Sequence, residues 1–253
     1  MKKDKRVKRK ISQKITLSII AINLVVLLIV GGVIGLLTNR DVGQLSNDNA
    51  KVQVDESINH IEVDFKEIES LVKGLAAQIG TEVDIEAGKA DIKYLHDITD
   101  NYEEKFRQIG LETQVTNSIF MYFNVALFGD AADTWVYGDT FERQPVIEAS
   151  YYDEHHDWYN IPIDDGVTQW TFPYLVVSGE AAGQLVSSFV TPITKDGQII
   201  GLIGMDLDLR VIDESLSSVQ LYDSGYLYMM APNGDIIVHQ NIEWKDSDGD
   251  GEK

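Results

Sequence analysis

The order of apolar and polar positions divides the chain into an apolar segment, a long amphipathic segment and a mixed C-terminal region. Residues 15–37 contain no charged side chain. From residue 54 to residue 79, apolar residues recur at alternating spacings of four and three, which is typical of a helix with one apolar face. A second helical pattern covers residues 90–110, and short runs rich in aromatic and β-branched residues then alternate with turn residues. The pattern therefore predicts helices first and β-structure afterwards.

The uncharged segment from Ile15 to Leu37 predicts a transmembrane helix. At about 1.5 Å per residue it is roughly 34 Å long, enough to cross a hydrocarbon core of about 30 Å. Residues 1–14 carry eight basic side chains and one acidic side chain. Basic flanks stay in the cytoplasm, so we expect a cytoplasmic tail at 1–14 and a single-pass anchor at 15–37 in the cell membrane, with the remainder outside the cytoplasm.

The amphipathic segment predicts a long helix over residues 38–80. We expect the glycines at positions 80 and 88 to end the helical pattern. A seam this regular packs against a partner chain or against the globular part of the same chain. We expect both: a homodimer through the helix near the membrane, and docking onto the domain further out. The seam residues are Val54, Ile58, Ile61, Phe65, Ile68, Val72, Leu75 and Ile79.

The region after residue 110 predicts an antiparallel meander. Turn pairs separate the candidate strands, and Asp196-Gly197 and Asn233-Gly234 are the clearest hairpin signals. Helices followed by successive strands indicate an α+β domain rather than alternating βαβ units. The predicted strands are 119–128, 134–137, 169–177, 184–193, 198–209, 225–231 and 235–239.

The charge of the chain excludes one class of partner. Beyond residue 14 there are 13 basic and 40 acidic residues, and this balance repels nucleic acid, so no nucleic-acid partner is expected. The chain has no cysteine and none of the common catalytic or phosphate-binding motifs, so we expect no enzyme activity and no cofactor. The neighbouring histidines at 155 and 156 lack a companion ligand at suitable spacing, so no metal site is expected.

The segment from Tyr151 to Tyr159 contains the densest group of chemically versatile side chains. It reads Tyr-Tyr-Asp-Glu-His-His-Asp-Trp-Tyr. Tyrosine and tryptophan combine broad apolar rings with a polar tip, and histidine can donate and accept hydrogen bonds. Such a group could line a small-molecule pocket, or it could simply form part of the core. Composition alone leaves both readings open.

Three motifs resemble the double Cache (dCache) sensor domains of bacterial chemoreceptors, sensor kinases and cyclic-di-GMP enzymes. They are Tyr-x4-His-x-Trp-Tyr at 151–159, Trp-Thr-Phe-Pro-Tyr at 170–174, and the long stretch at 187–206. The resemblance covers about residues 39–239. It implies a PAS-like antiparallel-sheet Cache module, distal from the membrane and ligand-binding, at 81–215. It also implies the start of an incomplete second module at 216–253.

The resemblance also implies a binding site, with two departures. Tyr151, Trp158, Tyr159, Tyr174 and Asp206 match ligand-contacting positions of the amino-acid-binding branch. The position of its carboxylate-binding arginine holds His156, and an expected aspartate is replaced by Val176. Arginine binds a carboxylate bidentately and is always charged, whereas histidine is partly neutral near pH 7. An α-amino acid thus remains compatible with an incomplete motif, and another small organic ligand is favoured.

Strand alternation gives an independent indication for Asp206. Between residues 199 and 209, one set of alternate positions is wholly apolar and suits a core face. Asp206 falls in the other set beside Gly204, where we expect the missing side chain to leave room for a ligand. The sequence thus predicts an extracytoplasmic small-molecule sensor whose signal passes through the long helix. The alternative is a ligand-free anchored dimerisation module or a receptor fragment without function.

Overall fold

The computed structural model describes residues 40–113, 116–144, 156–176, 179–219, 221, 225–231 and 234–239. The described residues form two compact units. Phe65–Asp208 form one, called the sheet unit here, and the described residues up to Asp64 and from Leu209 belong to the other, called the small unit. The predicted transmembrane segment lies outside the described residues. Among the residues that are described, no helix is both long and apolar enough to cross a bilayer.

Helix α2 runs from Arg40 to Glu82 as a single helix. Its part within the sheet unit packs on that unit's own β-sheet. The ring of Phe65 lies 4.5 Å from that of Trp170 between centroids, and Glu69 Oε1 accepts a hydrogen bond of 3.1 Å from Trp170 Nε1. The outer half of the apolar seam is therefore docked on the domain, as expected. The homodimer through the inner half stays a prediction.

The expectation that glycines end the helical pattern is wrong. Helix α2 continues past Gly80, and Gly88 lies inside the short helix α3 (Ile85–Ala90). Both glycines permit close packing instead. A Cβ on Gly80 would lie 2.5 Å from the carbonyl oxygen of Thr194, and one on Gly88 would lie 2.8 Å from the ring of Phe128. A missing side chain thus allows another part of the domain to approach the helix backbone.

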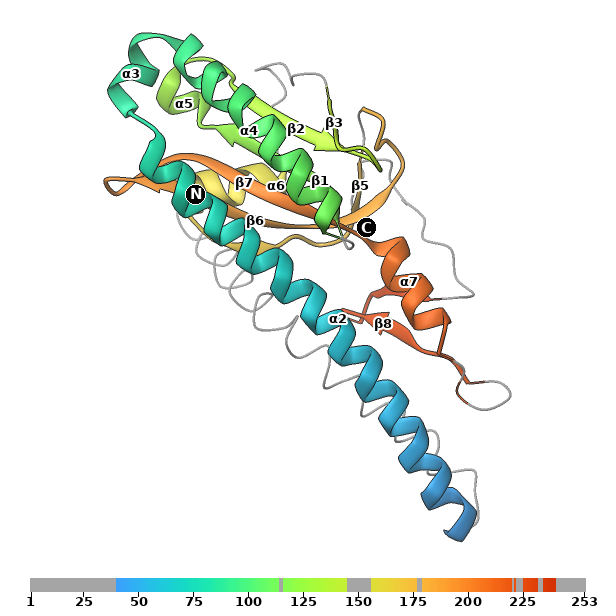
Figure 1. The fold of residues 1–253 in the computed structure, drawn as a ribbon. Coiled ribbons are helices and arrows are strands. Elements are labelled where there is room, and N and C mark those ends of the chain that lie inside the picture. Colours follow the sequence, from blue (N-terminus) through green and yellow to red (C-terminus); the bar gives the residue numbers. More distant parts are fainter. Residues whose placement is uncertain are drawn as a thin grey trace. The chain divides into compact units, whose positions relative to one another are not determined.

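Helix α4 (Ile92–Glu112) covers one face of the sheet, close to the predicted helix at 90–110. Its N-terminus is capped by Asp91, whose side chain accepts a hydrogen bond from the backbone N–H of Lys93. The side chains of Tyr102 and Phe106 are fully buried. Figure 1 shows α4 lying along strands β1 (Thr116–Phe123) and β2 (Asp133–Tyr137), and it contacts both.

The sheet of the sheet unit is antiparallel, with strand order β3-β2-β1-β7-β6-β4, and β5 also pairs with β6. The predicted hairpin at Asp196-Gly197 is confirmed; both residues have positive φ, and the turn joins β6 to β7. The fold class is confirmed in its coarser form: helices and an antiparallel, PAS-like sheet. The strands are β1 (Thr116–Phe123), β2 (Asp133–Tyr137), β3 (Glu142–Arg143), β4 (Gln169–Trp170), β5 (Tyr174–Leu175), β6 (Leu185–Lys195) and β7 (Gln198–Asp208).

Two predicted strands are shorter than expected. The strand predicted at 119–128 ends at Phe123, because Asn124 caps a helical turn, α5 (Val125–Phe128), by accepting a hydrogen bond from Leu127 N–H. The strand predicted at 169–177 is divided into β4 and β5, with Pro173 between them. Proline has no N–H to donate to a sheet ladder, so a continuous strand is interrupted there.

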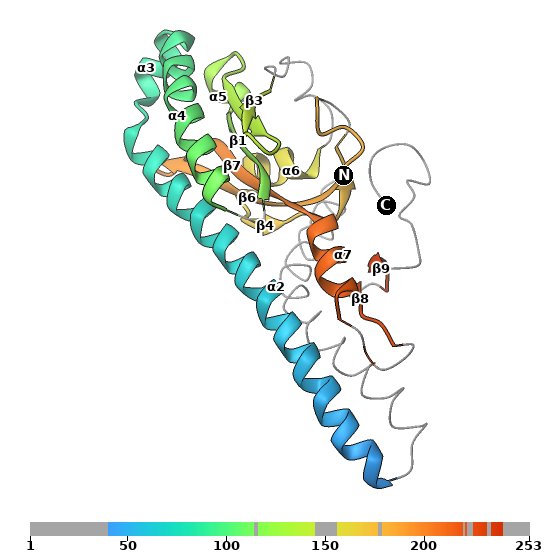
Figure 2. The ribbon, with the colours of Figure 1, turned by 45° about the vertical axis from the view of Figure 1, so that its right-hand side comes forward.

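The register places two different environments on the two faces of the sheet. Ile203, Met205 and Leu207 of β7 belong to the face that α2 and α4 cover. The opposite face carries Asp206, and we call it the Asp206 face. Helix α6 (Asp157–Asn160) and the π-helical turn η2 (Ile161–Asp165) lie against it (Figure 2). Residues of β7 on both faces are buried, so both faces form core.

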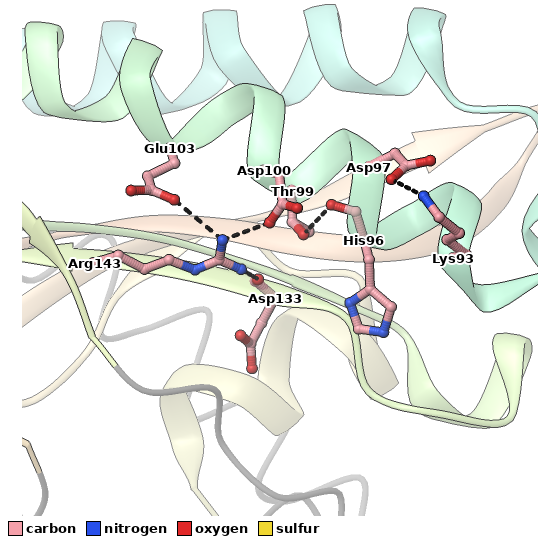
Figure 3. A network of polar contacts seen from close by, with 8 residues as sticks. All are labelled: Lys93, His96, Asp97, Thr99, Asp100, Glu103, Asp133 and Arg143. Carbon is pink, nitrogen blue, oxygen red and sulfur yellow. Dashed lines mark hydrogen bonds and ion pairs between the residues drawn. The ribbon is translucent and has the colours of Figure 1, made fainter.

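An arginine at the sheet edge joins α4 to β2. Arg143 on β3 places Nη1 2.5 Å from Asp100 Oδ1 and 3.1 Å from Glu103 Oε2, both on α4. Its Nη2 donates to the backbone carbonyl of Asp133 over 3.2 Å, while the Asp133 carboxylate points away from the guanidinium (Figure 3). The positive charge of Arg143 is therefore engaged on the helix side of the sheet edge.

The small unit contains helix α7 and a two-stranded sheet. Helix α7 (Leu209–Ser217) buries Leu209, Ile212 and Leu216. Strands β8 (Tyr228–Met230) and β9 (Ile236–His239) pair antiparallel, close to the predicted strands on either side of Asn233-Gly234.

Candidate functional site

The centre of the candidate site is the buried carboxyl group of Asp206 on β7. Ser188 on β6 pairs directly with it across the sheet, and Ser188 Oγ donates a hydrogen bond of 2.6 Å to Asp206 Oδ1. Ser188 Oγ is also 2.7 Å from the hydroxyl of Tyr174 on β5. The predicted residues Tyr174 and Asp206 are thus joined through one serine that sequence reasoning did not single out.

A second serine contacts Asp206 from the other neighbouring strand. Ser118 on β1 pairs with Asp206 in the register and is hydrogen-bonded to its carboxyl group. Ser118 Oγ accepts a hydrogen bond of 2.9 Å from Trp135 Nε1 on β2. Strands β1, β2, β5 and β6 therefore each contribute a hydrogen-bonding side chain to one connected group around the Asp206 carboxyl on β7.

Burial raises the pKa of the Asp206 carboxyl to about 6, and the hydrogen bonds from Ser188 and Ser118 oppose part of this increase. Removing an ionised carboxylate from water is costly, so a buried aspartate holds its proton at higher pH. The charge of Asp206 consequently changes in the physiological range, and a positively charged group placed beside it would favour its ionised form.

An aromatic cluster lies on the same face of the sheet. Trp158 of α6 contacts the rings of Phe120 and Tyr122 on β1 at centroid distances of 5.6 and 5.2 Å. Tyr159 lies 5.8 Å from Trp158, and His156 stacks on Trp158 at 6.0 Å with an interplanar angle of 24°. The segment predicted from the density of its chemistry is therefore brought onto the strand that also carries Ser118.

Tyr159 has a mainly structural environment. It is buried in the apolar cluster, and burial raises the pKa of its hydroxyl, while a hydrogen bond with the backbone of Val125 opposes this change. Tyr159 thus anchors α6 to the segment after β1. Trp158 and His156 are only partly buried.

The expectation about Gly204 is wrong in this structure. The space above Gly204 is occupied by the ring of Phe120, because a Cβ built on Gly204 would lie 2.4 Å from Phe120 Cζ and 3.0 Å from the carbonyl oxygen of Phe189. Phe120 pairs with Gly204 across the sheet, so the glycine accommodates an aromatic ring of the protein itself.

The predicted site residues thus fall into two neighbouring groups. Tyr174 and Asp206 share the serine network, and His156, Trp158 and Tyr159 share the aromatic cluster. Tyr151 lies outside the described residues. The side chains that connect these groups to the sheet were not predicted from the sequence: Ser118, Phe120, Tyr122, Trp135 and Ser188.

The comparisons with known sequences identify relatives of the domain that carries this site. Residues 94–214 match the family model of the methyl-accepting chemotaxis protein-like first PDC sensor domain. Over 102 residues the chain is 29% identical to the methyl-accepting chemotaxis protein PctB of Pseudomonas aeruginosa, a match that covers 40% of this chain and 16% of PctB. The match thus spans less than a fifth of that receptor's length. These relatives are chemoreceptors, not enzymes.

Solved structures share the fold. The ligand-binding domain of the Pseudomonas aeruginosa amino acid chemoreceptor PctC, in complex with GABA, has a TM-score of 0.56 at 16% identity and covers 78% of this chain and 73% of that chain. The ligand-binding domain of the Pseudomonas fluorescens chemoreceptor CtaA, in complex with L-serine, has a TM-score of 0.52 at 18% identity and covers 78% and 73%.

The match from residue 94 to residue 214 contains the whole serine network and the aromatic cluster. The shared fold agrees with the motifs at 151–159, 170–174 and 187–206. The resemblance to Cache-type sensors is therefore confirmed: residues 94–214 match the chemotaxis-protein-like PDC sensor model, and the domain shares its fold with solved chemoreceptor ligand-binding domains.

Proposed function

We propose that this chain is the extracytoplasmic sensing part of a bacterial transmembrane receptor, and that a small organic ligand binds on the Asp206 face between the serine network and the aromatic cluster. The observation that carries the proposal is the buried Asp206 carboxyl group, held by Ser188 and Ser118. A buried ionisable group with specific polar contacts beside aromatic side chains is typical of a binding site. The relatives that bind GABA and L-serine support a ligand of similar size.

The residues proposed to contact the ligand are those expected from the sequence, and the structure indicates the kind of contact that each would make. Asp206 and Tyr174 would provide polar contacts, and Trp158 an apolar surface, with His156 stacked on it. Tyr151 remains proposed on the resemblance alone. We retain the assignment of a distal binding module to 81–215, a second module beginning at 216, and a membrane anchor at 15–37.

A route for the signal follows from contacts inside the sheet unit. Ser188 lies beside Phe189 on β6, and Phe189 pairs with Trp170 on β4. The indole of Trp170 donates a hydrogen bond to Glu69 and contacts Phe65, both on α2. We propose that a ligand-induced shift of β6 reaches α2 through Trp170. Ligand binding would have to favour one arrangement, typically by about 1–3 kcal/mol.

A thermal-shift screen of the full 253-residue chain in detergent tests the binding proposal. The panel contains amines, amino acids, organic acids, purines and sugars, because any compound that binds the folded state raises its melting temperature. We expect a hit that is lost in Trp158→Ala and Asp206→Asn and kept in Phe172→Ala, which removes an aromatic ring that is 42% exposed.

Two results would count against the proposal. A hit that survives both site substitutions would place the ligand elsewhere. A chain that unfolds cooperatively and responds to no compound would favour the ligand-free module. For the signalling route, Glu69→Gln in a receptor that contains this sensor should alter the response to ligand while binding is kept; an unchanged response would contradict the route through Trp170.

A further inference from the structure

The sheet unit is unusually poor in positive charge around the candidate site. Between Arg107 and Arg210 the sequence contains 15 acidic residues and two basic residues, Arg143 and Lys195. This interval includes every strand of the seven-stranded sheet and the whole segment that covers the Asp206 face. A ligand that binds there meets few side chains able to neutralise a negative charge.

Both basic residues are engaged away from the site. Arg143 binds Asp100 and Glu103 on α4. Lys195, at the hairpin between β6 and β7, donates its Nζ proton to the carbonyl oxygen of Thr81 at the end of α2, over 3.0 Å. The other basic side chains in the described part of the sheet unit are all exposed and lie on α2, α3 and α4: Lys66, Lys73, Lys89, Lys93, Lys105 and Arg107.

Among the described residues, the Asp206 face, in contrast, carries three buried carboxyl groups. Asp133 of β2 and Asp206 and Asp208 of β7 have relative exposures of 3%, 4% and 5%. The register places all three on one face, through the pairs Asp133 with Tyr122 and Asp206 with Ser118. Asp208 accepts a hydrogen bond of 3.3 Å from the neutral amide of Asn117, through Nδ2.

These charges decide which ligand is tolerated. A buried ligand carboxylate needs a cation or several hydrogen-bond donors to offset its desolvation, and nearby aspartates add repulsion. A ligand ammonium group is attracted instead of repelled by the aspartates, whose negative charge it neutralises. It can also lie over the ring faces of Tyr122 and Trp158, and this cation–π contact offsets part of its desolvation. In the described part of the aromatic cluster, His156 is the basic side chain, and a histidine is partly neutral near pH 7.

We propose that the site selects an organic amine that carries no carboxylate group, and that it discriminates against the corresponding α-amino acid. The inference rests on the proposed function, because it names the ligand class of that same site. It differs from the amino acids that the solved relatives bind, and the reason is the distribution of charged side chains in this chain.

Matched pairs of compounds test the selectivity. The full chain in detergent is titrated by calorimetry with ethanolamine and L-serine, cadaverine and L-lysine, tyramine and L-tyrosine, and histamine and L-histidine, with succinate and glucose as anionic and neutral probes. We expect at least one amine to bind and its amino acid to bind at least about tenfold more weakly, a difference of about 1.4 kcal/mol.

The outcomes separate the inference from the proposed function. An amino acid that binds as tightly as its amine, or binding of succinate or glucose alone, overturns the amine selectivity while a ligand-binding sensor remains. Failure of every probe in this set and in the wider screen overturns both, provided that the chain unfolds cooperatively.

A variant that adds a positive charge to the site tests the same selectivity, because it should weaken the preference for amines. His156→Arg places a permanent cation beside Trp158, so the preference for the amine over its amino acid should fall by about tenfold or more. The matched control is His96→Arg on α4, outside the aromatic cluster, which should leave the preference unchanged. An unaltered preference in His156→Arg, with binding retained, would contradict the charge argument.

Discussion

Ser188 Oγ donates a hydrogen bond of 2.6 Å to Asp206 Oδ1 inside the sheet unit and is itself 2.7 Å from the hydroxyl of Tyr174. One serine thus holds two of the residues proposed to contact the ligand. Because Ser118 contacts the same carboxyl from the other side, Asp206 is positioned by both strands that flank it. A site of this kind is pre-organised before any ligand arrives.

Substitution of Ser188 by alanine should therefore affect more than stability. We expect Ser188→Ala to lower the free energy of unfolding by about 1–3 kcal/mol, because a buried carboxyl loses a donor, and to raise the pKa of Asp206 further. The neighbouring Ser187→Ala is a matched control, since Ser187 Oγ donates to the Thr171 carbonyl over 2.8 Å and does not contact Asp206.

Unfolding followed by tryptophan fluorescence, together with ligand titration, distinguishes the two serine variants. Ser187→Ala should lose about 1 kcal/mol and keep its ligand affinity. Equal losses of affinity in both variants would indicate a general effect of packing in β6 rather than a specific role of Ser188.

The raised pKa of Asp206 predicts a pH dependence with a definite sign. The folded state holds this proton up to about pH 6, whereas an unfolded aspartate releases it near pH 4. The bound proton therefore stabilises the folded state fully at pH values below the pKa of Asp206 in the unfolded chain, and this stabilisation is lost as the pH rises through 6. Relative to Asp206→Asn, the unmodified chain should lose about 1–1.5 kcal/mol of stability between pH 5 and pH 8.

Thermal unfolding of both chains at several pH values checks this dependence. The comparison with Asp206→Asn removes the contribution of the other carboxyl groups, which both chains share. If the stability of the unmodified chain relative to Asp206→Asn stayed constant across this range, or rose with pH, Asp206 would be ionised in the folded state throughout it.

Much of the fold was predictable because it depends on local patterns. The seam of α2 and the hairpin at Asp196-Gly197 follow from side-chain periodicity and turn chemistry, and both occur as expected. The roles of Gly80 and Gly204 were not predictable, because each depends on a partner distant in sequence: the Thr194 carbonyl for one and the Phe120 ring for the other. A glycine in a sequence does not reveal whether it breaks a helix or admits a neighbour.

The types of residue in the site were predictable from the sequence, but the pairs of residues that contact one another across the strands were not. Counting outward from the hairpin, where Lys195 pairs with Gln198, would place Asp206 opposite Ser187. The register shifts by one residue between Ile193 and Thr194, so Ser188 becomes the partner instead. The contact with Ser118 requires the pairing of β1 with β7, which no local pattern specifies.

Two glycines of α2 should respond oppositely to alanine. Gly74 has no heavy atom within 4 Å of an added Cβ, so Gly74→Ala should stabilise the chain by about 0.5–1 kcal/mol through helix propensity. Gly80→Ala gains the same propensity but meets the Thr194 carbonyl at 2.5 Å, and we expect a net loss of about 1–3 kcal/mol. Thermal unfolding of the two variants measures this; stabilisation by Gly80→Ala would show that the helix and the β6–β7 hairpin can separate without cost.

The packing of Phe120 over Gly204 predicts a compensating pair of substitutions. Gly204→Ala should destabilise the domain by about 1–3 kcal/mol, because the new methyl group overlaps the Phe120 ring at 2.4 Å. Phe120→Leu shortens that side chain, so the double variant should be more stable than the sum of the single effects predicts. A double-mutant cycle by thermal unfolding gives the coupling, which we expect to be at least about 0.5 kcal/mol. Strictly additive effects would mean that the clash is with the backbone of Phe189 instead, whose carbonyl oxygen lies 3.0 Å from the added Cβ.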